Sequence, residues 1–135
     1  ARAYVHLSSL RGWSEVDRRY RALMARRETP DERVAAAARA AVEGEDTPRE
    51  KVARLYQRVS NGVRYVGLEM GKHSYQPEQP AVTLARAYGD CKDKATLLIA
   101  MARAVDIPAH IVLVRTRPQG ALSPATASFA ACRGS

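Results

Sequence analysis

Hydrophobic residues recur at helical spacing in the first half of the chain and predict three successive helices. The first begins at Ser14, its predicted N-cap. The second begins at Thr29-Pro30 and the third at Thr47-Pro48, since each start combines a Thr cap, a Pro in the first turn and a Glu that completes a capping box. The predicted apolar faces are Val16, Tyr20, Leu23 and Met24 in the first helix, Val34, Ala37, Ala38, Ala41 and Val42 in the second, and Val52, Leu55, Tyr56 and Val59 in the third.

The pattern changes after residue 62. Residues 63–68 read as a short strand, and residues 71–80, which lack an apolar period, read as a loop. Residues 81–88 predict a short helix that leads into a longer one beginning at Cys91. That longer helix carries a broad apolar stripe and is therefore expected at the centre of the domain: Ala95, Leu97, Leu98, Met101 and Val105. Consecutive apolar residues predict a well-buried strand over 109–116.

These elements divide the 135-residue chain into three expected segments. Residues 1–13 form a leading segment from a preceding module, residues 14–116 form the core domain, and residues 117–135 form a loop and irregular tail. The chain begins with neither an initiator Met nor the apolar core of a signal peptide, so we expect it to start inside something longer. A hydrophobic content of 46% is typical of a globular domain, and no uninterrupted apolar stretch is long enough to predict a membrane span.

The net charge of +8 raises the possibility of a nucleic-acid partner. The distribution of the charge argues against one. Most of the 22 basic residues are arginines scattered along the whole chain, chiefly on the polar faces of predicted helices, and motifs for reading nucleic acid are absent. A basic nucleic-acid-binding domain is therefore the least favoured interpretation.

Two cysteines, Cys91 and Cys132, are too few for a disulfide framework, although a single bridge between them stays open. Their spacing matches no common zinc pattern. Adding His73 and His110 produces no pair of ligands at metal spacing. The sequence therefore predicts no metal and no cofactor.

Cys91 has the position of a nucleophile. It follows Gly89 and Asp90, the predicted N-cap, so the thiol lies in the first turn of a helix, with Asp93 placed to complete a capping box. The positive end of the helix dipole, together with Lys92 and the lysine two residues further on, favours a thiolate. Such a thiolate suits acyl transfer, in which helix N–H groups hold the oxyanion and a His moves the proton. The competing interpretation is a buried structural thiol.

The run from Tyr88 to Leu98, followed by Ile107-Pro108-Ala109 and Val112 to Thr116, closely resembles bacterial transglutaminase-like proteins. Upstream, Val63-Arg64-Tyr65-Val66 and Tyr75-Gln76-Pro77 extend the resemblance to roughly residues 1–122. The resemblance implies an α+β fold, specifically the N-terminal helical half of a papain-like domain that follows an accessory β domain. The nucleophile helix would pack on a partial antiparallel sheet, and the catalytic His and Asp would come from the next two strands.

Of the family's catalytic residues, only Cys91 has a match in this chain. Where the family has its histidine, Ser128-Phe129 is followed by Ala130-Ala131, and the later Asp is also absent. We therefore expect the chain to be truncated or frame-shifted before these residues. Two other histidines are candidates for a substitute base, His110 at the start of the predicted last strand and His73 in the loop after residue 71.

Together these observations predict a transglutaminase-like cysteine acyltransferase or amide hydrolase that acts on a protein or peptide amide through a Cys91 thioester. The chain as printed is expected to be inactive. The alternative is a non-catalytic binding or structural relic that keeps the thiol and lacks the base. The resemblance further implies an extracytoplasmic location, and the oligomeric state is left open.

Overall fold

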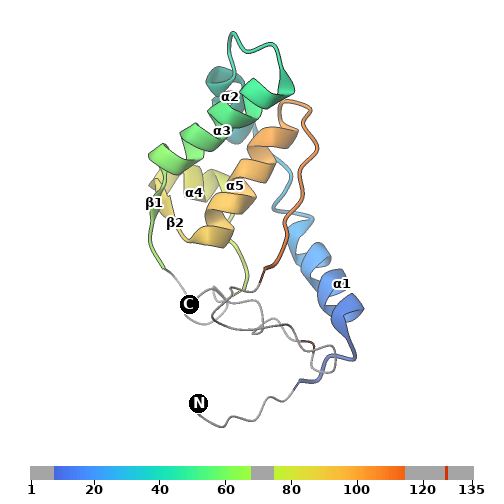
Figure 1. Ribbon diagram of the computed structural model, residues 1–135. Coiled ribbons are helices and arrows are strands. Elements are labelled where there is room, and N and C mark those ends of the chain that lie inside the picture. Colours follow the sequence, from blue (N-terminus) through green and yellow to red (C-terminus); the bar gives the residue numbers. More distant parts are fainter. Residues whose placement is uncertain (1–7, 68–74, 115–126, 128–135) are drawn as a thin grey trace. The chain divides into compact units, whose positions relative to one another are not determined.

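The computed structural model describes residues 8–67, 75–114 and 127 (Figure 1). The chain divides into two compact units, one from residues 1–23 and 112–135 and the other from residues 24–111. In chain order the described elements are α1 (Trp13–Met24), α2 (Glu32–Ala41), α3 (Pro48–Gly62), β1 (Arg64–Tyr65), α4 (Pro80–Arg86), β2 (Tyr88–Gly89) and α5 (Cys91–Arg103). Helices and short strands are mixed, as the predicted α+β class requires.

Helix α5 is the centre of the larger unit, as its broad apolar stripe predicts. It packs against α2, α3 and α4, which lie close to it in Figure 1. Leu97 and Met101 are fully buried, and so are polar or small neighbours on other faces of the helix, including Thr96 and Ala100. The core that α5 shares with the other helices consists of Val34, Ala38, Val42, Leu55, Val59, Val63, Leu97, Ala100, Met101 and Ala102. A helix buried on most of its circumference holds both of its ends in fixed positions.

Helix α3 confirms its predicted start and corrects its predicted face. Thr47 and Glu50 form the full capping box, with Pro48 in the first turn, and the hydrogen bonds from Thr47 lower the pKa of the Glu50 carboxyl. Leu55 and Val59 are buried. Two other residues of the predicted apolar face are exposed, Val52 by 44% and Tyr56 by 61%. The buried face of α3 is therefore narrower than the apolar face predicted from its sequence, because only one side of the helix packs against described elements.

Two predicted caps are wrong. Asp31 caps α2 in place of Thr29, since its carboxylate accepts a hydrogen bond from the Val34 N–H at 2.9 Å and the helix begins one residue later. An Asp at this position is as good a cap as Thr, so the rule alone did not separate the two. Helix α1 begins at Trp13, which places Ser14 inside the helix. Its predicted face is confirmed at Val16, Tyr20 and Met24, which are buried.

The described sheet is one short pair, and its strands are parallel. Arg64 of β1 lies opposite Tyr88 of β2, and Tyr65 lies opposite Gly89. The predicted antiparallel arrangement is wrong for this pair, because the connection runs through α4 and returns the chain in its original direction. The predicted strand over 63–68 is confirmed only at residues 64–65, and the helix predicted at 81–88 is observed as α4.

The strand predicted over 109–116 is not observed in residues 109–114, which form no strand. Val112 and Val114 are 75% and 66% exposed, whereas Ile111 and Leu113 are half-buried. The alternation is that of an extended segment with one covered side. A strand needs a hydrogen-bonded neighbour, and the described residues place none beside this segment. Arg115 and Thr116 lie outside the described residues.

A matched pair of substitutions on α3 tests this packing. Val59→Ala should lower the free energy of unfolding by about 2 kcal/mol, because it removes buried methyl groups and leaves a cavity. Val52→Ala, on the exposed flank of the same helix, should lower it by less than about 0.5 kcal/mol. Urea denaturation of both variants measures the difference, and equal losses would contradict the buried stripe described above.

Candidate active site

Cys91 is the first residue of α5, and its thiol is exposed and not in a disulfide. Strand β2 ends at Gly89, one residue separates it from the helix, and that residue is the cap Asp90. The chain therefore passes directly from a paired strand into the helix that bears the thiol. This is the location that the sequence predicts, and it differs from that of a buried structural cysteine.

Asp90 caps α5 from a buried position. Its side chain is 2% exposed, and its Oδ1 accepts hydrogen bonds from the N–H groups of Lys92 at 3.1 Å and Asp93 at 3.2 Å. Its backbone carbonyl accepts the N–H of Lys94 at 3.0 Å. Among the described residues, the N–H of Cys91 is thus the first-turn donor left without an acceptor. An oxyanion formed at the thiol would accept a hydrogen bond from this one N–H. The sequence, in contrast, predicts several donors at the start of the helix.

Asp93 completes the capping box and connects it to two other segments. Its Oδ2 accepts the N–H of Asp90 at 3.3 Å and a guanidinium N–H of Arg86 at 2.8 Å. Its Oδ1 accepts the N–H of Glu78 at 2.8 Å, from the segment before α4. The Asp93 side chain is 4% exposed, so this carboxylate depends on these donors in place of water. The prediction that Asp93 is a capping residue is confirmed.

Gly89 is required by the close approach of Asp93. A Cβ atom at residue 89 would lie 2.8 Å from the Asp93 Cβ and 3.0 Å from its Oδ2. Real Cβ atoms do not approach one another so closely, so a larger residue would displace the carboxylate. Packing therefore requires a glycine at residue 89, directly before the capping Asp90.

The two lysines near Cys91 are engaged with other oxygen atoms. The Lys92 ammonium pairs with Oδ2 of Asp90. The Lys94 ammonium donates to the carbonyl oxygens of Val63 at 2.7 Å and Ser60 at 3.3 Å, which caps the C-terminal end of α3. Lys94 thus has a capping role in addition to the positive charge that the sequence places near Cys91. Both ammonium groups therefore have oxygen partners other than Cys91.

The structure does not bring a described histidine to Cys91. His110 is exposed on the segment after α5, which is held to that helix by a hydrogen bond from Arg103 to the Ala109 carbonyl at 3.0 Å. Ile107 and Ala109 pack against the core, so His110 lies on the opposite side of the extended chain. No hydrogen bond joins it to Cys91 among the residues that the structure describes. His73 and the N-terminal His6 lie outside the described residues.

Sequence reasoning did not single out Arg86 or Glu78. Arg86 donates to the Tyr88 carbonyl at 2.7 Å as well as to Asp93, and its guanidinium lies 4.7 Å from the centre of the Tyr88 ring. Glu78 supplies the backbone N–H to Asp93, and its carboxylate lies 3.8 Å from the same guanidinium. The sequence carries little signal for either residue, since an Arg near the end of a helix is common and its partner is seven positions away.

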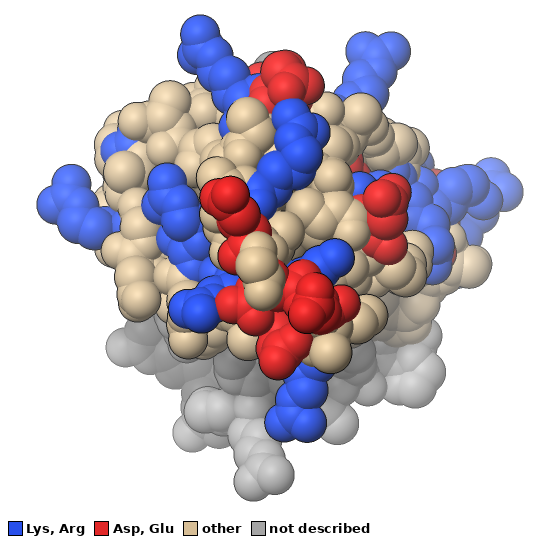
Figure 2. Space-filling model, turned by 90° about the horizontal axis from the view of Figure 1, so that it is seen from above, with Lys and Arg blue, Asp and Glu red and all other residues tan. Residues whose placement is uncertain are grey.

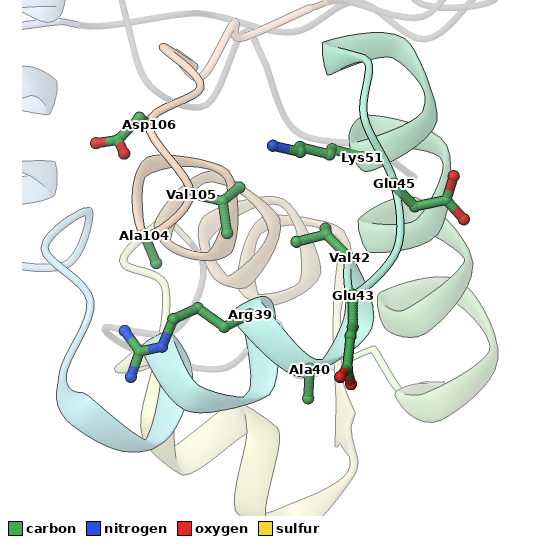
Figure 3. A pocket seen from close by; sticks show the side chains of 9 residues that line it. All are labelled: Arg39, Ala40, Val42, Glu43, Glu45, Lys51, Ala104, Val105 and Asp106. Carbon is green, nitrogen blue, oxygen red and sulfur yellow. The ribbon is translucent and has the colours of Figure 1, made fainter.

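A pocket of about 560 Å³ lies at the other end of α5 (Figure 3). Its lining residues are Arg39, Ala40, Val42, Glu43, Glu45, Lys51, Ala104, Val105 and Asp106. The 13 residues of α5 separate it from Cys91, a helix length of roughly 20 Å. The pocket and the Cys91 thiol therefore lie at opposite ends of α5, so the pocket is not a substrate cleft for Cys91.

The described residues show few features of other kinds of site, such as a nucleic-acid-binding surface or a metal site. Figure 2 shows basic and acidic side chains interspersed on the face that it displays. Within the described part of the chain, no group of His, Cys, Asp and Glu is arranged to hold a metal ion. Nor does any helix in those residues have the length and apolar character needed to cross a membrane.

Comparison with known proteins gives one match. The family model of the transglutaminase-like superfamily matches residues 35–133, a range that begins within α2 and includes α3 to α5 and the Cys91 turn. No curated protein and no solved structure matches the chain.

The packing of Gly89 can be tested with a glycine control. Gly89→Ala should lower the free energy of unfolding by about 1 to 3 kcal/mol, because the new methyl group overlaps the Asp93 side chain. Gly67→Ala places its methyl group in open space and should change stability by no more than about 0.5 kcal/mol. Urea denaturation measures both, and a Gly89→Ala protein as stable as Gly67→Ala would refute the close approach.

Proposed function

Because the chain belongs to the transglutaminase-like superfamily, we propose that it is a cysteine acyltransferase or amide hydrolase that acts through a thioester on Cys91. The observation that carries the proposal is the exposed thiol on the first residue of α5. A thiol there combines solvent access with the positive end of a helix, the two conditions that make a cysteine reactive. The substrate class is a protein or peptide amide.

The proposed reaction has two steps. The Cys91 thiolate attacks the carbonyl carbon of the amide, and the Cys91 N–H donates to the resulting oxyanion. The C–N bond then breaks, the amine leaves with a proton from an acid-base group, and the acyl group stays on sulfur as a thioester. Water or a second amine attacks the thioester, gives its proton to the same group and releases the Cys91 thiolate.

The proposed reaction also needs an acid-base group near the sulfur. In the family it is a histidine, and His110 and His73 are the candidates in this sequence. His110 faces away from the core and makes no described hydrogen bond to Cys91. Loss of one member of such a catalytic group lowers the rate by on the order of 10⁴. We therefore expect the chain as printed to acylate at Cys91 and to turn over amides very slowly.

The outward position of His110 also favours a second candidate function, a non-catalytic member of the family that keeps the fold for binding. Its Cys91 would be an exposed but ordinary thiol. The two functions differ in one measurable property, the reactivity of Cys91 in the absence of a base.

An activated ester separates the nucleophile from the base, because nitrophenolate leaves without needing a proton. With p-nitrophenyl acetate the protein should release a burst of nitrophenolate equal to its own concentration and carry an acetyl thioester on Cys91. Cys91→Ala should lose the burst, and Cys132→Ser should keep it. A wild-type protein without a burst would reject the nucleophile and favour the binding function. Rapid turnover of a peptide p-nitroanilide would contradict the expected inactivity of this chain.

Iodoacetamide gives an independent measure of the same thiol. Across pH 6 to 7, Cys91 should be alkylated faster than Cys132, because the start of α5 favours its thiolate. Peptide mapping by mass spectrometry reads both sites in one sample. Equal rates would count against an activated Cys91.

A further inference from the structure

We propose that Arg86 is a positioning residue for Cys91, acting through the buried carboxylate of Asp93. This inference rests on the proposed function of Cys91, and it assigns a role in that function to a residue on a different helix. Arg86 is the last residue of α4, and Cys91 is the first residue of α5. Between them lie the turn and strand β2, which place the thiol.

Arg86 holds this connection at two points. Its Nε donates to the Tyr88 carbonyl at 2.7 Å, and its Nη2 donates to Oδ2 of Asp93 at 2.8 Å. The guanidinium also lies against the Tyr88 ring, 4.7 Å from its centre. A single planar group thus joins the strand before the nucleophile to the first turn of the helix after it. Lysine has one nitrogen in place of this fork and is unable to reproduce both bonds in the same geometry.

The charge of Arg86 is what allows Asp93 to work from a buried position. An ionised carboxylate excluded from water is strongly unfavourable unless a cation and hydrogen-bond donors accompany it. The Arg86 side chain is 19% exposed and the Asp93 side chain 4%, so both partners are largely shielded. With its charge balanced, Asp93 accepts the Asp90 N–H at 3.3 Å and holds the residue that precedes Cys91.

The backbone between the two helices leaves little room for adjustment. Ala87, directly after Arg86, has a left-handed conformation with a φ of 56°, and its carbonyl accepts the Arg64 N–H at 2.9 Å. Gly89 carries no side chain because Asp93 fills that space. Removing Arg86 releases the carboxylate that packs on Gly89, so the displacement is passed directly to Asp90 and Cys91.

Three variants and one control test the proposal. Arg86→Lys keeps the charge and loses the fork, and Arg86→Met removes both. Arg86→Met combined with Asp93→Leu replaces the buried ion pair by apolar groups, a change that often preserves stability. Arg54→Lys is the control, because Arg54 forms an ion pair with Glu45 in which its own side chain is 57% exposed.

Two readouts are needed for each protein. One is the rate of Cys91 acylation by p-nitrophenyl acetate, and the other is hydrogen exchange at the Asp90 amide, measured by NMR, which does not depend on thiol reactivity. Arg86→Lys should slow acylation and speed exchange, each on the order of tenfold. The double variant should have a higher urea midpoint than Arg86→Met yet keep the slow acylation. Arg54→Lys should match the wild-type protein in both.

The outcomes separate this proposal from the proposed function. Wild-type rates of acylation and exchange in Arg86→Lys and in the double variant would overturn the role of Arg86 and leave the nucleophile intact. Acylation that recovers together with stability in the double variant would also overturn it, because Arg86 would then be purely structural. A wild-type protein that fails to acylate, with faster Asp90 exchange in the variants, would reject the proposed function and support the positioning role.

Discussion

The buried Asp93 carboxylate is the interaction on which the geometry of the Cys91 turn depends. It accepts hydrogen bonds from Glu78, Arg86 and Asp90, which belong to the segment before α4, to α4 itself and to the cap of α5. A carboxylate with so little access to water must keep these donors or become strongly unfavourable. Three segments are therefore tied to one side chain, and the thiol two residues away takes its position from them.

The rest of the larger unit holds this arrangement in place. Helix α5 packs against α2, α3 and α4, so its first turn has little freedom to move without disturbing the core. Lys94 adds a second connection, because its ammonium group caps the C-terminal end of α3 from within α5. The protein thus places the exposed Cys91 thiol at the edge of a tightly packed core. That combination of an exposed thiol and an immobile support is what a nucleophile requires.

The proposed acyl transfer needs a nucleophile, an oxyanion donor and a base close together. The structure places an exposed thiol and a backbone N–H at the start of α5, where the proposed reaction needs its nucleophile and an oxyanion donor. Proton transfer needs a histidine beside the sulfur, and His110 is on the outer side of its segment. The mixed-charge pocket at the far end of α5 does not contribute to this chemistry. The described residues thus place the proposed nucleophile at the start of α5 and bring no described histidine beside it.

The sequence by itself determined the features that depend on local rules. The capping boxes at Thr47 and Asp90 follow from hydrogen bonds within a few residues, and the stripe of α5 follows from helical periodicity. Only the tertiary structure decided the features that depend on distant partners. The exposed Val52 on α3 and the missing strand over 109–114 reflect which neighbours are present, and the Arg86–Asp93 pair joins two helices. Local hydrogen bonds depend on residues that are close in the sequence. Burial, strand pairing and ion pairs between helices depend on residues that only the fold brings together.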